Sequence, residues 1–531
     1  MHLTKHPQNP IMTINKLTLD TLESWLWDSA NILRGSIDSS DFKNYIFGLL
    51  FLKRSNDVFM EEVDLIMERD GISRSDAEEE TYFQLPLEAR WDTIKKVTEN
   101  IGVALDKAFA AIERENTGLE GVMTATKFGD KEKLSDAILQ RLLRHFNQHS
   151  LKNKDLVSAD LLGDAYEYLI KQFADDAGKK GGEFYTPRGV VQLIVQLIKP
   201  QPKQKVYDPT CGSGGMLIES ARYIAKQPNG KVGNNINVSL YGQEKNLSTW
   251  AIGKLNMLLH NFMDADVRKG DTLVDPKHLN DQNELMLFDR VIANPPFSMG
   301  EWWTPAETNI EVKLDKDGKE KKITPNYNKV VSDPHGRFQF GIPPRGYADL
   351  AFLQHMISVL KQDGRAGVVL PHGSLFRGGS EGNIREGLLK ADFIEGIVGL
   401  PAALFYNTSI PASVWIINKN KSKAQKDKLI IIDASAYFKN GKNQNELQDI
   451  HIDKIVNAYD GNADLDKYMR VVDCTEIKEN DYNLNISRYI DTSEAEAEID
   501  LAIVKSTIAD LEAKEQEIDA RLSDFLKELG I

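Results

Sequence analysis

A run of four residues, Asn294-Pro295-Pro296-Phe297, combines a side-chain amide, two rigid prolines and an aromatic ring. An exocyclic amino nitrogen of a nucleobase is a weak nucleophile, because its lone pair is delocalised into the ring. The side-chain oxygen of Asn294 and the carbonyl of Pro295 could accept hydrogen bonds from both N–H groups, and the prolines would hold these acceptors in place. The run therefore predicts methyl transfer to an amino group without a metal, with Phe297 stacked on a base flipped from the duplex. A rigid turn without chemistry is the alternative.

A second polar run, Asp208-Pro209-Thr210-Cys211-Gly212-Ser213-Gly214-Gly215, leads directly into the apolar residues 216–218. Glycines let a backbone turn sharply and approach a ligand closely, as in nucleotide-binding folds. From spacing alone the turn could hold NAD, a phosphate or an adenosyl cofactor, or it could be only a tight turn. The chain contains no Gly-Lys-Ser or Gly-Lys-Thr, so it lacks a P-loop, and we expect no ATP-driven motor in it.

Two acidic residues stand where further strands are expected to end. Glu244 could accept hydrogen bonds from both hydroxyls of a ribose. Its distance from Gly212 is longer than the usual spacing, and a polar loop at 227–237 accounts for the difference. Asp271 could accept a hydrogen bond from an adenine amino group, or it could be an ordinary surface aspartate in a turn. The pattern does not decide between these two readings of Asp271.

These residues lie in a region, 175–490, where short apolar runs alternate with helical stretches. The expected strands are 205–208, 239–242, 288–293, 367–370 and 414–417, with a helix at 350–360. Such alternation predicts an α/β fold with a mostly parallel, doubly wound, Rossmann-like sheet, in which ligands bind at the carboxyl ends of the strands. The stretch 298–345 has little periodicity, and we expect a long loop there.

Helical patterns flank this region on both sides. Residues 1–174 repeat apolar positions at helical spacing, as in 19–33, 42–49 and 138–146, and predict an N-terminal helical domain. Residues 491–531 predict a C-terminal helix for subunit assembly. Its apolar residues fall on a three-then-four spacing: Leu501, Val504, Ile508, Leu511, Ile518, Leu522, Phe525 and Leu529. Such a seam packs on a partner helix or folds back onto its own protein, and the pattern favours neither.

Composition limits the classes of protein that remain. The 531 residues carry a net charge of −14, of which residues from Asp491 onward contribute −8, so a partner is expected to supply much of any grip on DNA. Only Cys211 and Cys474 occur, which argues against zinc or disulfide frameworks and favours a reducing, cytoplasmic location. The apolar stretch 396–418 is interrupted by prolines and predicts two strands with a loop, not a membrane span.

Taken in order, the runs 182–187, 208–215 and 294–297 resemble the modification subunits of type I restriction-modification systems, a family of amino-methyltransferases. Further matching segments are Arg345–Phe352, Arg365–Pro371 and Asn483–Tyr489. The resemblance implies S-adenosyl-L-methionine as cofactor and duplex DNA as substrate. It also implies a specificity subunit, a second copy of the modification subunit, and a motor-nuclease restriction subunit for cleavage. The DNA sequence recognised would be read by the specificity subunit.

The resemblance also assigns residues. The segment Glu183, Phe184, Tyr185, Thr186, Pro187 and Arg188 would close over the methionine end of the cofactor. The residues Ser213, Gly214, Gly215 and Glu244 would hold its adenosyl part, and Asn294, Pro295, Pro296 and Phe297 would hold the target base. With Asp208, Thr210, Gly212 and Asp271 from the strand ends, these are the expected site residues.

The target and the class of activity leave alternatives. Methylation of cytosine carbon 5 needs a cysteine, typically after proline, whereas Cys211 follows Thr210 and Cys474 follows Asp473. Cytosine-N4 enzymes resemble the chain but usually carry serine at the position of Asn294, so adenine N6 is favoured. An RNA or protein-glutamine methyltransferase, or a scaffold that kept the fold without activity, are the other possibilities. The long helical region argues against the former, and the intact motif residues argue against the latter.

Overall fold

The computed structural model describes residues 16–158, 160–176, 185–233, 235–303, 311–314, 320–323, 331–405, 409–441, 444–492 and 501–530. Two of the expected site residues, Glu183 and Phe184, lie outside them. The chain divides into two compact units, Met1–Ile490 and Asp491–Ile531. Within the described residues, no helix has both the length and the apolar character needed to cross a membrane.

The first part of the larger unit is a layer of helices, as the periodicity predicted. They are α1 Leu19–Leu33, α2 Phe42–Asp70, α3 Arg74–Glu79, α4 Trp91–Ile94, α5 Ile101–Glu115, α6 Asp136–Phe146 and α7 Leu161–Asp176. The apolar positions read from the sequence, among them Leu22, Leu26 and Phe146, are fully buried. They therefore form the core of this layer and not a binding surface.

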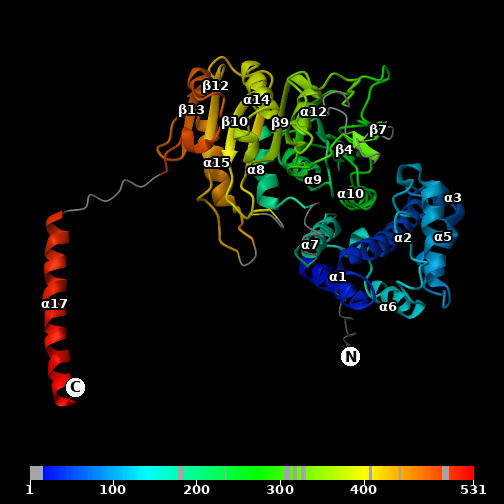
Figure 1. The fold of residues 1–531 in the computed structure, drawn as a ribbon. Helices are drawn as coiled ribbons and strands as arrows, with labels where there is room; N and C mark the ends of the chain where they lie inside the picture. The colour runs from blue at the N-terminus through cyan, green and yellow to red at the C-terminus, as the bar shows by residue number, and fades with distance from the viewer. Residues whose placement is uncertain are drawn as a thin grey trace, which may run out of the picture. The chain divides into compact units, whose positions relative to one another are not determined.

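The second part is built on a nine-stranded sheet (Figure 1). In sheet order the strands are β13 Met469–Asp473, β12 Lys428–Asp433, β10 Ile394–Gly399, β11 Ala412–Asn418, β9 Leu360–Pro371, β6 Phe288–Ala293, β1 Lys205–Asp208, β4 Ser239–Glu244 and β5 Asp266–Lys269. The five strands from β9 to β5 are parallel to their neighbours, whereas β11 runs antiparallel to β9 and to β10. The expected mostly parallel sheet is thus confirmed, with antiparallel pairs beyond β9.

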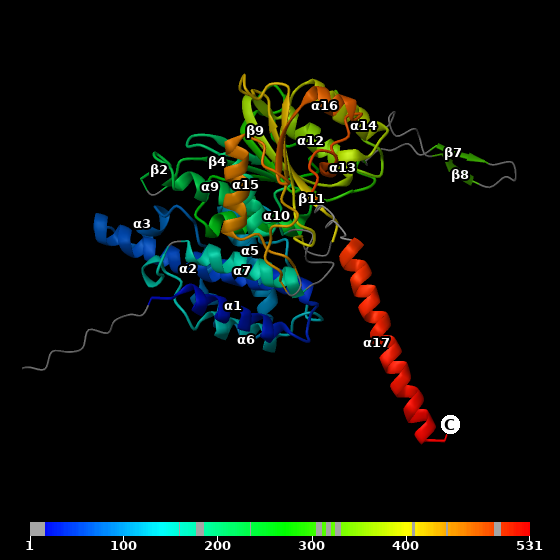
Figure 2. The same ribbon diagram turned by 90° about the vertical axis from the view of Figure 1, so that its left-hand side faces the viewer.

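Helices cover both faces of the sheet. They are α8 Arg188–Ile198, α9 Gly215–Ala225, α10 Leu247–Leu259 and α15 Asp449–Gly461 on one face, and α12 Asp349–Ser358, α14 Ser380–Lys390 and α16 Cys474–Glu479 on the other, with the short α13 Gly373–Phe376 after β9. Neighbouring residues of a strand serve different faces: Ile292 packs with the first set, and Val291 and Ala293 with the second. Figures 1 and 2 show the helices α1 to α7 on the side of the sheet that carries α10.

The helical layer is joined to the sheet part through α7 and α10. The hydroxyl of Tyr166 in α7 donates to the carbonyl of Ile252 in α10 at 3.1 Å. Gly163 lies so close to the imidazole of His260 that a Cβ there would approach the ring to 2.2 Å. Only glycine fits this contact, so α7 packs directly on the end of α10.

The segment 298–345 differs from the loop that we expected. It contains a small antiparallel pair of strands, β7 Glu311–Leu314 and β8 Glu320–Ile323. A second short pair, β2 Lys231–Val232 and β3 Asn235–Ile236, lies outside this segment, before β4. Trp302 and Trp303 are buried in a small apolar cluster with Phe352 of α12. This cluster could not be predicted from the local sequence, because its tryptophans pack on a helix that lies some fifty residues later in the chain.

Candidate functional site: the carboxyl edge of strands β4, β1 and β6

Three neighbouring strands bring the predicted polar residues to one edge of the sheet. Asp208 is the last residue of β1, Glu244 is the last of β4, and Asn294 directly follows the end of β6. Both β4 and β6 pair in parallel with β1, which lies between them. Adjacent strands are about 4.8 Å apart, so the three side chains occupy an edge about 10 Å wide. The chain runs from β1 outward through β4 to β5 and then returns to β6, so this edge is the switch point where ligands of such sheets bind.

The glycine-rich run forms a tight turn between β1 and α9. Gly212 and Gly214 have φ angles of +52° and +82°, a region that side chains other than glycine rarely adopt. A Cβ on Gly214 would also lie 2.3 Å from the terminal methyl of Met257. The amide of Asn256 donates to the carbonyl of Ser213 at 2.8 Å and fixes the turn against α10. The turn is therefore held in a shape that only these glycines allow.

Glu244 is buried at the end of β4 and holds the glycine turn from the other side. Its carboxylate accepts from the backbone N–H of Asn246 at 2.7 Å and from that of Gly212 at 3.1 Å. Burial raises the pKa of Glu244, and these backbone N–H groups partly offset the increase. Each carboxylate oxygen can accept one further hydrogen bond, so Glu244 can bind a pair of hydroxyls.

Asp208 carries a carboxylate oxygen that lacks a partner. The residue is 1% exposed, and its Oδ1 accepts from the N–H of Thr210 at 2.9 Å, while Oδ2 has no hydrogen bond. The hydroxyl of Thr210 is also buried without a partner. Burial, with a smaller contribution from the nearby Glu244, raises the pKa of Asp208 to about 8. The free oxygen of Asp208 could accept a hydrogen bond from a polar ligand, so the role predicted for it stays a prediction.

Asn294 has one satisfied and one unsatisfied end. Its amide nitrogen donates to Oγ1 of Thr186 at 3.0 Å, whereas its side-chain oxygen is buried and has no partner. Thr186 precedes Pro187, the N-cap of α8, and α8 packs against β9 and β6. The contact with Thr186 thus fixes which end of the Asn294 amide accepts a hydrogen bond from a ligand.

The rest of the tetrapeptide supplies a wall and an aromatic ring. Pro295 is buried, Pro296 is exposed, and Phe297 is half-buried. The ring of Phe297 packs edge to face on Phe405, with centroids 5.3 Å apart and an interplanar angle of 71°. Phe405 lies in the loop after β10 and was not predicted from the sequence, because a single phenylalanine in a loop gives no pattern.

The remaining predicted residues, Tyr185, Arg188 and Asp271, differ in their exposure and in their partners. Tyr185 is half-buried beside Thr186, and Arg188 is the exposed first residue of α8. Asp271 accepts from the backbone N–H groups of Leu273 at 3.0 Å and Val274 at 3.3 Å, and it pairs with the ammonium of Lys245 at 2.7 Å. These are the contacts of a turn aspartate with a lysine partner, and a contact between Asp271 and a ligand stays a prediction.

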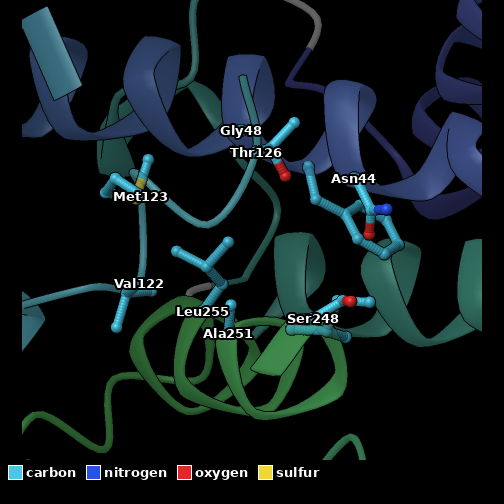
Figure 3. A pocket seen from close by; sticks show the side chains of 10 residues that line it. Asn44, Gly48, Val122, Met123, Thr126, Ser248, Ala251 and Leu255 are labelled. Carbon is cyan, nitrogen blue, oxygen red and sulfur yellow. The ribbon is translucent and has the colours of Figure 1, made fainter. Parts of the chain in front are cut away.

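A small cavity lies away from this edge, between the helical layer and α10 (Figure 3). It is lined by α2, by the loop at 122–126 and by one side of α10, with Asn44 and Ser248 among its polar residues. None of the predicted site residues lines it. Among the described residues, no three histidine, cysteine or acidic side chains gather as metal ligands would.

Comparisons with known proteins extend over both parts of the chain. A model of the N-6 DNA Methylase family matches residues 157–498, and a model of the HsdM N-terminal domain matches residues 22–146. The type I restriction enzyme MjaVIII methylase subunit of Methanocaldococcus jannaschii is 32% identical, over 97% of this chain and 86% of its own length. The MpnII methylase subunit of Mycoplasma pneumoniae is 28% identical, over 96% of each chain. A solved methyltransferase subunit of a type I restriction-modification system from Streptococcus thermophilus has a TM-score of 0.74 and 32% identity, over 90% of this chain and 100% of that one.

Proposed function

Since the chain belongs to the N-6 DNA methylase family, as a methylase subunit of a type I restriction enzyme, we propose that it transfers the methyl group of S-adenosyl-L-methionine to the N6 amino group of adenine in duplex DNA. The family accounts for the reaction class and the target atom. Cytosine-N4, RNA and protein-glutamine substrates find no support in these similarities.

The observation that carries the proposal is the unpartnered oxygen of Asn294. With its nitrogen held by Thr186, the Asn294 oxygen is a fixed acceptor for one N–H of the adenine amino group. The Pro295 carbonyl accepts the other N–H, and the ring of Phe297 stacks on the flipped base. Accepting from both N–H groups favours a pyramidal nitrogen whose lone pair is available. Since these acceptors are already in place, little reorganisation is needed during the reaction.

The strand-end carboxylates suit the cofactor. Glu244 accepts from the two ribose hydroxyls, and the turn at Ser213 to Gly215 lets the adenosyl part lie against the backbone. The free Oδ2 of Asp208 and the free hydroxyl of Thr210 accept from the ammonium of the methionine end, beside the segment that contains Tyr185. When bound, S-adenosyl-L-methionine would supply a methyl carbon on a positively charged sulfur. The N6–carbon bond would form as the carbon–sulfur bond breaks, the sulfur would leave as a neutral thioether, and the proton lost from N6 would pass to solvent.

The smaller unit, Asp491–Ile531, is the part of the chain that we propose binds another subunit. We infer that α17 Leu501–Glu528 binds a specificity subunit, because the helix forms a compact unit of its own and its apolar residues Val504, Ile508, Leu511, Ile518, Leu522 and Phe525 follow a three-then-four spacing. A helix with such a seam is stable when the seam is covered by a partner helix. The specificity subunit would read the DNA sequence, join a second copy of this chain, and recruit a restriction subunit for cleavage. A location in the cytoplasm, where the DNA is, is part of the same proposal.

The test is transfer of labelled methyl groups to duplex DNA by the full-length chain, with and without its specificity subunit. The proposal expects N6-methyladenine in the product when both chains are present. Label found in cytosine, in RNA or in protein would contradict the proposed target, and cofactor binding without any transfer would indicate a scaffold. A methylation map of the source genome would identify the sequence that is modified.

A further inference from the structure

The residue after the catalytic tetrapeptide adopts a strained backbone. Ser298 has a φ angle of +50°, in the left-handed region that serine rarely enters. Such a conformation costs about 1–2 kcal/mol and persists only where surrounding contacts impose it. Ser298 directly follows Phe297 and stands three residues after Pro295, so its conformation sets the direction in which the tetrapeptide enters the site.

Two charged side chains from later in the chain impose this conformation. The carboxylate of Asp349, the first residue of α12, accepts from the backbone N–H of Ser298 at 2.8 Å. Arg377, which follows α13, donates to the other oxygen of Asp349 at 3.2 Å and to the hydroxyl of Ser298 at 3.4 Å. The backbone is held beyond Ser298 as well, where the N–H of Ala348 donates to the carbonyl of Met299 at 3.0 Å.

The burial and charge of these side chains indicate that they hold the backbone of Ser298 in place more than they stabilise the folded protein. Asp349 is fully buried and Glu381, which also accepts from Arg377 at 3.3 Å, is 2% exposed. Two buried acids therefore share one guanidinium, and a buried ion pair is often no more stabilising than an apolar replacement. The guanidinium carbon of Arg377 lies 4.0 Å from the ring centroid of Tyr347, which restricts the orientation of the guanidinium.

We infer that Asp349 and Arg377 form a positioning brace that holds Ser298, and through it sets the Pro295 carbonyl and the Phe297 ring against the target base. This inference rests on the proposed function. Both side chains of the brace act on the base through Ser298, so both are positioning residues. A displacement of about 1 Å in such a site can cost about 100-fold in rate, so loosening the brace lowers kcat.

The first experiment replaces Asp349 by asparagine in the full-length chain, purified with its specificity subunit. Asparagine keeps the shape but places an N–H group where one oxygen accepts from Ser298 or Arg377. We expect kcat on unmethylated duplex genomic DNA to fall about 100-fold, while the affinity for S-adenosyl-L-methionine stays at the wild-type value. The two-way readout separates a displaced base pocket from a damaged cofactor site.

The matched control is Glu395→Gln, which breaks a similar buried pair with Arg365 in the same sheet. Glu395 lies near the start of β10, at the opposite end of the strands from the site, and its side chain is 4% exposed. We expect this variant to lower Tm as much as Asp349→Asn does and to keep the wild-type kcat. Equal kcat losses in the two variants would show that the brace acts only through stability and would overturn the inference.

A second variant, Arg377→Met, keeps the test informative if Asp349→Asn fails to fold. The Arg377 side chain is 26% exposed, so its replacement should disturb folding less. If the pair acts as one unit, the double variant loses no more kcat than either single one, whereas independent effects would multiply. Wild-type kcat in Arg377→Met, or multiplying losses, would contradict the brace. Absence of DNA methylation by the wild-type complex would instead contradict the proposed function.

Discussion

The side-chain nitrogen of Asn294 donates to Oγ1 of Thr186 at 3.0 Å, across 108 positions of sequence. This contact joins the segment before α8 to the end of β6. It uses the donor end of the Asn294 amide and leaves the acceptor end buried and free.

Replacing Asn294 by alanine is expected to lower methyl transfer by about 10²–10³-fold or more, because a preorganised partner of the reacting group is lost. Affinity for the cofactor should be unchanged, since Asn294 contacts the target and not the methyl donor. Single-turnover transfer and equilibrium cofactor binding measure the two effects. Asn294→Asp, which keeps an acceptor oxygen, is the matched variant and should keep more activity than alanine; comparable activity in Asn294→Ala would disprove the assigned role.

Replacing Thr186 by valine keeps the shape and removes the acceptor for the Asn294 nitrogen. The amide can then rotate, so we expect kcat to fall about tenfold, the equivalent of about 1.4 kcal/mol. Thr186→Ser should restore the wild-type rate because it returns the hydroxyl. If valine and serine give the same rate, the Thr186 contact does not orient Asn294.

The buried carboxyl of Asp208 predicts a pH-dependent cofactor affinity. Its pKa is raised to about 8 by burial, so the acid is mostly protonated at pH 6 and becomes a carboxylate above pH 8. The ammonium of the ligand prefers the carboxylate, so we expect affinity to rise with pH from 6 towards 8 and to fall at higher pH, where the ammonium loses its own proton. Titration calorimetry at several pH values measures this, and the rise should be absent in Asp208→Asn.

The raised pKa of Asp208 also lowers the stability of the folded protein at neutral and alkaline pH. The folded protein binds the proton more tightly than the unfolded chain does, so the contribution of Asp208 to stability falls as pH rises from about 4 to about 8. The Asp208→Asn variant should therefore gain Tm relative to wild type at pH 8 and gain less at pH 6. An equal difference at both pH values would mean that Asp208 does not titrate in this range.

Gly214→Ala is expected to weaken both folding and cofactor binding. The alanine must adopt a φ of +82° and place its Cβ against Met257, and the backbone strain alone costs about 1–2 kcal/mol. Gly461→Ala, at the end of α15, is the control, because a Cβ there meets nothing within 4 Å and no positive φ is required. Thermal unfolding and cofactor titration compare the two, and equal behaviour would remove the argument from the glycine turn.

Removing residues from 492 onward tests the role of α17. We expect the shortened chain to bind cofactor normally, because the site lies in the other unit, and to lose co-purification with the specificity subunit. A milder variant, Leu511→Lys, places a charge in the middle of the apolar seam and should weaken assembly in the same direction. Full assembly of both variants would contradict a docking role for the helix.

The sequence predicted those parts of the fold that local patterns determine. The expected strands 205–208 and 288–293 coincide with β1 and β6, and the expected helix 350–360 corresponds to α12. The strands expected within 396–418 are β10 and β11, but the apolar run did not reveal that β11 is antiparallel to its neighbours. Strand direction depends on how the chain returns across the sheet, and no local pattern encodes it.

The candidate site was predictable only in part for the same reason. Asn294 and Glu244 could be named because each follows an expected strand. The sequence could not predict that Thr186, Phe405 and Asp349 contact this region, because each lies in a segment far from residues 294–298 in the chain. Asp271 remained ambiguous in the sequence, and its hydrogen bonds within its own turn explain why an aspartate suits that position without a ligand.

The close contact of α7 with α10 affects how the protein can be divided. Apolar residues of the helical layer, such as Leu26 and Phe47, belong to one continuous core with Val190 of α8 and Ile292 of β6. A recombinant fragment that ends near residue 174 is expected to expose apolar residues of this shared core to water, and so is one that begins there. Gene fusions or split versions of this enzyme are therefore expected to tolerate a junction after residue 490, where the larger unit is complete, better than one near residue 174.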